Sequence, residues 1–300
     1  MINSPVKWIG GKGTAASRIV AAFPHPDSYD VYIEPCGGAA HVLLSKPPYR
    51  HDEILNDRDG LLINFWRVLQ SHTPELREQV LRRPYARELY YHYYHSLFGT
   101  KAQLPDASLD EMEKAVRWYY ILRSNMTGYL RQSAPGWTTL HAKTMKQVAD
   151  HLFLAVQERI QYVAIDNRDV IETVLRYQKL KRAFFYVDPP YFGVEAYYPA
   201  CREQGGFDHE GLATILNACP CPVALSYYPH SRIDALYPQE KWHRITWQQY
   251  KASSCAQDGD SDTATEMLLC NYGPKQLAAF QDTLFHTEEL LLPPQERICL

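Results

Sequence analysis

The sequence predicts an α/β fold with an inserted, mostly helical segment. Short apolar runs alternate with helical periods toward both ends of the chain, an alternation typical of parallel sheets with crossover helices. Between residues 71 and 145 the alternation stops, and basic residues, tyrosines and helical periods dominate. The pattern therefore divides the chain into a first α/β part (1–70), a helical insert (71–145) and a second α/β part (146–300).

The first α/β part contains two predicted strands. Val31–Ile33 is apolar and is followed by the small-residue turn Glu34–Ala40 and by a helix that begins at His41. Strand, small-residue turn and helix together open a nucleotide-binding βα unit. Glu53–Asp57 predicts the next strand, and the apolar spacing of Leu61–Gln70 predicts an amphipathic helix.

The second α/β part resumes the alternation. The uninterrupted apolar run Ala183–Val187 predicts a buried strand. The sheet is predicted to close with an antiparallel pair of strands, Trp242–Trp247 and Glu266–Tyr272. The polar, Asp-rich loop Ser253–Thr265 lies between them in the sequence. The remaining predicted elements are helices at Met145–Gln157, Val170–Leu180 and Asp208–Ala218, with Asp208 as a cap, and strands at Ile160–Ile165 and Pro222–Ser226.

Composition indicates a globular protein without a membrane span. The 300 residues carry a net charge of −3, which argues against a protein that coats nucleic acid nonspecifically. No apolar run reaches the length of a membrane helix, and the N-terminus lacks a signal-peptide core, so we expect a cytoplasmic protein. The seven cysteines have no repeated pair spacing, which favours reduced thiols, and we expect no metal site at Cys219 and Cys221.

The segment Asp188-Pro189-Pro190-Tyr191 carries the strongest functional signal. It directly follows the predicted strand Ala183–Val187, and ligands of open α/β sheets bind outside the carboxyl ends of strands. The prolines lack N–H donors, so a carboxylate, free carbonyls and an aromatic ring meet there. This set suits a planar base with an exocyclic amine and predicts group transfer onto an amino nitrogen. The alternative is a sharp turn without function.

Two glycine-containing segments predict ligand contacts. In Lys7–Gly13, the glycines permit close approach of the backbone, Trp8 offers a flat wall and Lys12 can hold a carboxylate. In Glu34–Ala40, the Glu34 carboxylate favours an ammonium over a phosphate. Asp57 ends the next strand, where an acid binds ribose hydroxyls in nucleoside-binding folds. The alternatives are a flexible basic N-terminus, a plain strand–helix turn and an N-cap.

The order of these motifs resembles the Dam-like N6-adenine-specific DNA methyltransferases over nearly the whole chain. The matching residues are Lys-Trp-x-Gly-Gly-Lys from Lys7, Glu-Pro-x-x-Gly from Glu34, Asn56-Asp57, Asp188–Tyr191 and a late Glu-Met-Leu-Leu-x-Asn-Tyr from Glu266. The resemblance implies a Rossmann-like, S-adenosylmethionine-dependent methyltransferase sheet with an inserted, mostly helical DNA-recognition domain. It also implies a double-stranded DNA partner with a flipped adenine, and no metal.

The resemblance also implies residue roles. Asp188-Pro189-Pro190-Tyr191 would form the catalytic loop, and Ser226–Tyr228 would shape the base pocket. Residues that would bind S-adenosylmethionine are Trp8, Lys12, Glu34, Pro35, Gly38, Asp57, Asp169 and Asp188, with Asp169 beside the adenine ring of the cofactor. Residues that would contact DNA are Arg123, Asn125, Tyr129 and Arg131; Arg77, Arg82 and Arg83 are weaker candidates that a solvated charged face explains equally well.

Alternatives stay open at this point. The same loop chemistry serves methylation of the cytosine 4-amino group or of RNA adenine, and a DNA-binding relative with weak catalysis is a further alternative. A restriction endonuclease partner is also open. Cys36 and Ala40 depart from the family pattern of the glycine turn, and the loop from Cys255 to Thr265 is acidic where relatives often carry basic residues.

Overall fold

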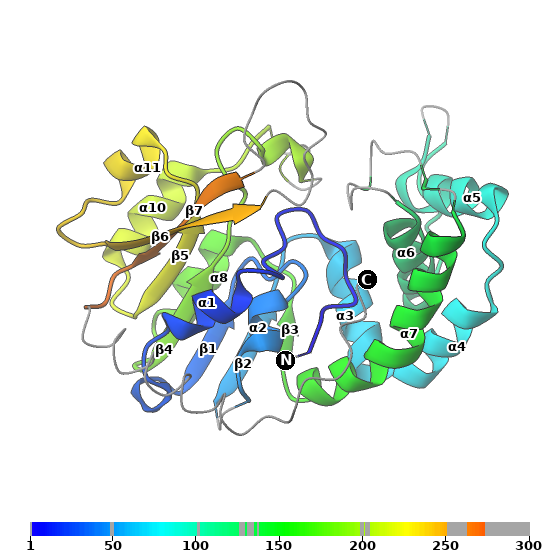
Figure 1. The fold of residues 1–300 in the computed structure, drawn as a ribbon, viewed down its shortest axis with the longest axis horizontal. Helices are drawn as coiled ribbons and strands as arrows, with labels where there is room; N and C mark the ends of the chain where they lie inside the picture. Colours follow the sequence, from blue (N-terminus) through cyan, green and yellow to red (C-terminus); the bar gives the residue numbers. More distant parts are fainter. Residues whose placement is uncertain are drawn as a thin grey trace.

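The computed structural model describes residues 2–48, 51–100, 103–125, 130, 135–136, 138–198, 201, 205–250 and 263–273. A seven-stranded sheet in the order β3-β2-β1-β4-β5-β7-β6 crosses these residues (Figure 1). The first five strands in this order are parallel, whereas β7 runs antiparallel to both β5 and β6. The strands are β1 (Val31–Glu34), β2 (Asp52–Asn56), β3 (Ala164–Asp166), β4 (Ala183–Val187), β5 (Val223–Tyr227), β6 (His243–Tyr250) and β7 (Thr263–Cys270).

Helices cover both faces of the sheet. The face of Tyr32 and Phe184 packs in one core cluster, and the face of Ile33 and Phe185 packs in another. Because successive side chains of a strand point to opposite faces, both faces must be apolar, which explains the continuous apolar run in β4. Around the sheet lie α1 (Ala16–Ala21), α2 (His41–Ser45), α3 (Gly60–Ser71), α8 (Val170–Tyr177), α10 (His209–Ala218) and α11 (Ser231–Leu236).

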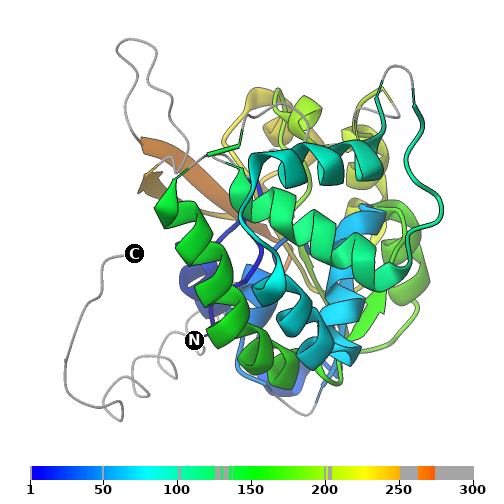
Figure 2. The same ribbon diagram turned by 90° about the vertical axis from the view of Figure 1, so that its right-hand side faces the viewer.

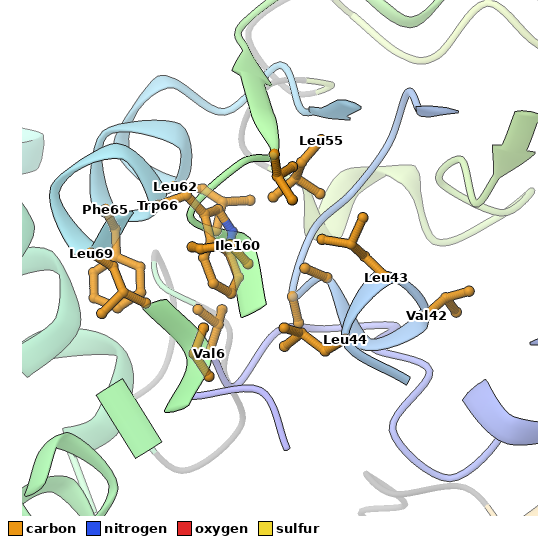
Figure 3. Close-up of a cluster of buried hydrophobic side chains, with 14 of the residues drawn as sticks. Val6, Val42, Leu43, Leu44, Leu55, Leu62, Phe65, Trp66, Leu69 and Ile160 are labelled. Carbon is orange, nitrogen blue, oxygen red and sulfur yellow. The ribbon is translucent and has the colours of Figure 1, made fainter. Parts of the chain in front are cut away.

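A second group of helices lies in the chain between α3 and β3. It consists of α4 (Thr73–Arg82), α5 (Arg87–Phe98), α6 (Glu111–Ser124) and α7 (Thr139–Ile160), which stand together on the right in Figure 1 and face the viewer in Figure 2. Phe65 of α3 stacks on Tyr119 of α6 with ring centroids 5.5 Å apart. Ile160 of α7 belongs to the same core cluster as Leu62 and Leu69 (Figure 3). The insert therefore shares its core with the sheet.

The strand predicted at Ile160–Ile165 is largely wrong. Helix α7 continues to Ile160, and β3 contains only Ala164–Asp166. The side chain of Ile160 is fully buried in the core cluster that contains α3, so tertiary packing outweighs the strand preference of this β-branched residue. The boundary predicted at residue 145 falls within α7, and the division of the chain into parts stays a prediction.

Other predicted elements are confirmed. Asp208 caps α10 by accepting a hydrogen bond from the Gly211 N–H. The predicted antiparallel pair corresponds to β6 and β7, although most of the loop between them, and so most of the acidic segment 255–265, lies outside the described residues. None of the helices in the described ranges has the length and apolarity to cross a membrane.

Candidate active site

A cavity opens where the strand order reverses between β1 and β4. Such a switch point places the carboxyl ends of neighbouring strands on either side of a crevice, where ligands of open α/β sheets bind. The lining includes all eight residues expected to bind the cofactor, namely Trp8, Lys12, Glu34, Pro35, Gly38, Asp57, Asp169 and Asp188. Of the rest of the predicted catalytic loop, Pro190 also lines the cavity.

The turn after β1 is tightly held against the loop after β2. The Gly37 N–H donates to the carbonyl of Asn56 at 2.7 Å, and the Gly38 N–H donates to Asp57 Oδ2 at 2.9 Å. Gly38 has a φ of +48°, and a Cβ there would lie 3.0 Å from the ring of Trp8. Glycine is therefore required for both the backbone angle and the close approach of Trp8.

Ala40 shows how the chain accommodates one departure from the family pattern. It caps α2 with a φ of +53°, a left-handed conformation that disfavours side chains with a Cβ.

The acids near the cavity also organise its loops. Asp57 accepts hydrogen bonds from the N–H groups of Gly38 and Asp59, and burial raises the pKa of its carboxyl to about 6. Asp169 caps α8 through the Ile171 N–H and forms an ion pair with Arg58 at 2.9 Å. Both carboxylates still line the cavity, so loop support and ligand binding are compatible.

Glu34 is a buried carboxyl with an elevated pKa. The Tyr32 hydroxyl donates to Glu34 Oε1 at 2.5 Å. Burial raises the pKa of Glu34 to about 8, against the effect of this hydrogen bond. The group is thus mostly protonated at neutral pH until a cation arrives to favour its charged form.

The catalytic loop predicted from the sequence begins at an ion pair. Lys12 Nζ lies 2.9 Å from Asp188 Oδ1, and it also donates to the Gly10 carbonyl at 2.8 Å. Burial raises the pKa of Asp188, and the Lys12 ammonium opposes that rise. The carboxylate that Lys12 was expected to hold is therefore one of the protein's own, 176 residues away in the chain.

Aromatic side chains and a second acid surround this ion pair. The Tyr191 hydroxyl donates to Glu266 Oε2 at 3.2 Å, and its ring meets the ring of Tyr228 edge-on at 4.6 Å. Lys12 Nζ lies 4.8 Å from the centre of the Tyr191 ring. Sequence reasoning assigned no role to Glu266. The sequence signal that could have identified Glu266 is its position as an acid at the start of the apolar run in β7.

His41 lines the cavity itself and was also given no role by sequence reasoning. A Cβ at Gly11 would lie 3.0 Å from the His41 ring, so the N-terminal loop packs directly on it. Burial and the nearby Lys12 lower the pKa of His41 to about 4. The imidazole is thus neutral at physiological pH.

Of the residues predicted to contact DNA, Arg123 and Asn125 are described, and neither is part of the cavity lining. Arg123 ends α6, and buried Asn125 pairs with Pro135 in an isolated β-bridge. Tyr129 and Arg131 lie outside the described residues. The weaker candidates Arg77, Arg82 and Arg83 form ion pairs with Asp150, Glu78 and Glu113, respectively, which favours the alternative of a charged face.

Comparison with protein families matches residues 8–250 to the D12 class N6 adenine-specific DNA methyltransferases. The chain belongs to this family. A search of curated proteins found no match. The methyltransferase transfers a methyl group from S-adenosylmethionine to the 6-amino group of adenine in DNA. The family supports adenine in DNA over the cytosine and RNA alternatives, and the sheet is the Rossmann-like one that the resemblance implied.

The cavity suits S-adenosylmethionine chemically. It combines a tryptophan wall, a glycine turn with close backbone approach, and carboxyl groups that can accept from an ammonium or from hydroxyl groups. In the described part of the methyltransferase, no group of three or more His, Cys, Asp or Glu residues could hold a metal ion.

Proposed function

We propose that Asp188-Pro189-Pro190-Tyr191 acts on an adenine extruded from duplex DNA. The observation that carries this proposal is the Asp188 carboxylate at the carboxyl end of β4, fixed by Lys12 at 2.9 Å beside the cavity. Extrusion costs a few kcal/mol, and stacking on an aromatic ring returns about 1–3 kcal/mol per base. The Tyr191 and Tyr228 rings provide such aromatic surface, and Tyr228 is 40% exposed.

The protein's part in the chemistry is to prepare the amine. The lone pair of an exocyclic amine is delocalised into the ring, which makes the nitrogen a poor nucleophile. The Asp188 carboxylate and the Pro189 carbonyl accept hydrogen bonds from its two hydrogens and so localise the lone pair. When bound, S-adenosylmethionine supplies a methyl group activated by its sulfonium. Fixed acceptors in a water-poor site need no reorganisation during the reaction.

The product identifies the amine that is methylated. Purified protein is incubated with labelled S-adenosylmethionine and unmethylated DNA or RNA, and the nucleosides of each digest are separated. We expect label in N6-methyladenine from DNA. Label in N4-methylcytosine, label in RNA adenine, or binding without any transfer would each support one of the alternatives and contradict this proposal.

We propose that Glu34 accepts the ammonium of the cofactor, with Trp8, Lys12, Pro35, Gly38, Asp57, Asp169 and Asp188 forming the rest of the site. This assignment is supported by the burial of Glu34 in the cavity wall, where the Tyr32 hydroxyl donates to one of its two carboxyl oxygens. Asp57 keeps its predicted role toward the ribose hydroxyls, and Asp169 its role beside the adenine ring.

Cofactor affinity should therefore rise with pH. At pH values below the Glu34 pKa of about 8, the ammonium of the ligand must displace the proton of the Glu34 carboxyl when it binds. The affinity for S-adenosylhomocysteine should therefore increase by up to about tenfold per pH unit toward pH 8. Titration calorimetry at several pH values measures this slope and the released proton. Glu34→Gln should flatten the slope, and an equally steep slope in that variant would rule out Glu34 as its source.

We propose that Arg123, Asn125, Tyr129 and Arg131 contact DNA, with residues 71–145 as the recognition insert. Two cations lie near each other here, since burial lowers the pKa of Lys7 and the Arg123 guanidinium lowers it further. Lys7 Nζ donates to the Asn125 carbonyl at 3.3 Å, which connects the N-terminal segment to the end of α6. Such a concentration of cations suits the phosphate backbone.

Arg123→Ala should weaken DNA binding mainly through electrostatics. Loss of one phosphate contact should reduce the slope of log affinity against log salt by about one unit. Fluorescence anisotropy of labelled duplex DNA at several salt concentrations measures this slope. Arg82→Ala, in an exposed ion pair with Glu78, is the control and should leave it unchanged. Equal slopes of log affinity against log salt for wild type and Arg123→Ala would show that Arg123 does not contact a DNA phosphate.

We further propose that the enzyme acts in the cytoplasm and that it protects DNA from a restriction endonuclease partner. The DNA substrate of the family is compatible with both. Sequencing host DNA for modified bases with and without the gene tests the first, and cleavage of the unmodified DNA tests the second. Host DNA that stays unmodified in the presence of the protein would contradict the first proposal. Unmodified DNA that escapes cleavage in cells without the protein would contradict the second.

A further inference from the structure

A second buried carboxylate lies behind the catalytic loop. Glu266 of β7 is 6% exposed and accepts a hydrogen bond from the Tyr191 hydroxyl. In the sheet register, Tyr227 at the end of β5 pairs with Met267, so Glu266 extends past the carboxyl end of β5. This is the same edge at which β4 ends and Asp188 follows.

One cation serves both acids. The electrostatic attraction of Asp188 and of Glu266 raises the pKa of Lys12 despite its burial. Burial raises the pKa of both Asp188 and Glu266, Lys12 lowers both, and Asp188 raises that of Glu266. When both acids are ionised, the group of Asp188, Glu266 and Lys12 carries one net negative charge.

That net charge matters for the acceptor role proposed for Asp188. If Lys12 were balanced by Asp188 alone, the pair would be neutral and Asp188 would attract the hydrogens of the amine less strongly. The amine gains positive charge as its bond to the methyl carbon forms and the bond from that carbon to sulfur breaks, which leaves S-adenosylhomocysteine. The surplus proton of the amine then passes to the Asp188 carboxylate and from there to solvent. A site with one surplus negative charge stabilises that developing cation.

We propose that Glu266 is a positioning residue for methyl transfer, whose negative charge offsets Lys12 so that Asp188 keeps its strength as a hydrogen-bond acceptor. This inference rests on the function proposed for Asp188. Glu266 acts through Lys12 and Asp188 and does not itself touch the base. Its hydrogen bond to Tyr191 also holds the aromatic ring of the loop, and the Tyr191 hydroxyl interacts with Asp188 as well. Removing that hydroxyl therefore measures the contribution of the hydrogen bonds apart from the charge of Glu266.

Glu266→Gln removes the charge and keeps an acceptor for Tyr191, whereas Tyr191→Phe removes the hydroxyl and keeps the charge. In single-turnover assays at saturating cofactor and DNA, Glu266→Gln should slow methyl transfer on the order of 10- to 100-fold. Affinity for S-adenosylhomocysteine and the fluorescence of 2-aminopurine at the target position should stay near wild type. Tyr191→Phe should lose less than Glu266→Gln.

A double variant tests the effect of net charge independently. In the double variant Lys12→Gln/Glu266→Gln, the net charge of minus one is restored on Asp188, so transfer should be no slower than in Lys12→Gln alone. The inference is overturned if the losses of the two single variants add in the double variant, or if Glu266→Gln leaves the rate unchanged. It is also overturned if Tyr191→Phe loses more rate than Glu266→Gln, or if the rate loss of Glu266→Gln is matched by lost cofactor affinity. Thermal unfolding of each variant shows whether the fold is kept.

Controls separate this inference from the function on which it rests. Glu240→Gln, an exposed residue before β6, should behave as wild type. If Asp188→Asn is inactive and Glu266→Gln is fully active, only the inference fails. If Asp188→Asn keeps wild-type activity, the proposed function fails, whatever Glu266→Gln shows.

Discussion

Replacing Asp188 with asparagine should slow methyl transfer by about 10³-fold or more, which is the range for removal of a central electrostatic or proton-accepting group. Asparagine keeps the shape of the side chain but loses the charge that orients the amine. S-adenosylhomocysteine should still bind, with weakened affinity, because the turn after β1 and the Trp8 wall are unchanged. Single-turnover transfer and equilibrium cofactor binding measure the two effects separately.

A matched control tests whether any lost aspartate has this effect. Asp234 of α11 is 56% exposed and forms an ion pair with Arg244 at 3.0 Å, away from the cavity lining. Asp234→Asn should transfer methyl groups at the wild-type rate. Transfer by Asp188→Asn within a few fold of wild type would contradict the proposed role, provided that its thermal unfolding shows an intact fold.

Replacing Glu53 with alanine should destabilise the protein by about 3–5 kcal/mol, the range for removal of one partner from a buried ion pair. Glu53 of β2 accepts from Lys46 at 2.8 Å and from Arg159 at 2.5 and 2.8 Å. Lys46, Glu53 and Arg159 are 2%, 8% and 5% exposed, so two buried cations would lose their carboxylate. Urea unfolding measures the change in free energy.

The exposed pair of Glu210 and Arg232 supplies the comparison. Its members are 73% and 59% exposed at an N–O distance of 3.2 Å. Such surface pairs contribute about 0–1 kcal/mol, so Glu210→Ala should change the free energy of unfolding by less than about 1 kcal/mol. Equal effects of Glu53→Ala and Glu210→Ala would show that burial of the cluster does not determine its contribution.

The Glu53 cluster also explains how α7 is attached to the sheet. Arg159 lies at the end of α7 and donates to the Leu43 carbonyl at 2.8 Å as well as to Glu53. One side chain thus joins α7, α2 and β2. Sequence reasoning could not find this link, since Glu53 and Arg159 are 106 residues apart and neither lies in a recognisable motif.

Much of the cavity wall followed from local pattern. Glu34, Asp57 and Asp188 each follow or end a short apolar run, and the carboxyl ends of parallel strands meet at one edge of a sheet. Once the strands were identified, their polar terminal residues had to lie near one another. The loops bearing Trp8 and Lys12 required the family resemblance as well, because no strand precedes them in the described residues.

The pairings within the site did not follow from the sequence. Lys12 with Asp188 and Tyr191 with Glu266 depend on how distant loops pack, and single-residue chemistry carries no signal for that. The end of α7 was misassigned for a similar reason, since Ile160 favours a strand locally but is buried against α3. His41 looked like an ordinary first residue of a helix, and its place in the cavity wall appears only in three dimensions.

The central claim is that the amine of an extruded adenine is held by the Asp188 carboxylate and the Pro189 carbonyl. A crystal structure of the protein with S-adenosylhomocysteine and DNA that it methylates tests this most directly. We expect the target nitrogen to lie within hydrogen-bond distance, at about 3 Å, of both the Asp188 carboxylate and the Pro189 carbonyl. A target adenine that stays stacked in the duplex, or one whose amine points away from Asp188, would contradict it.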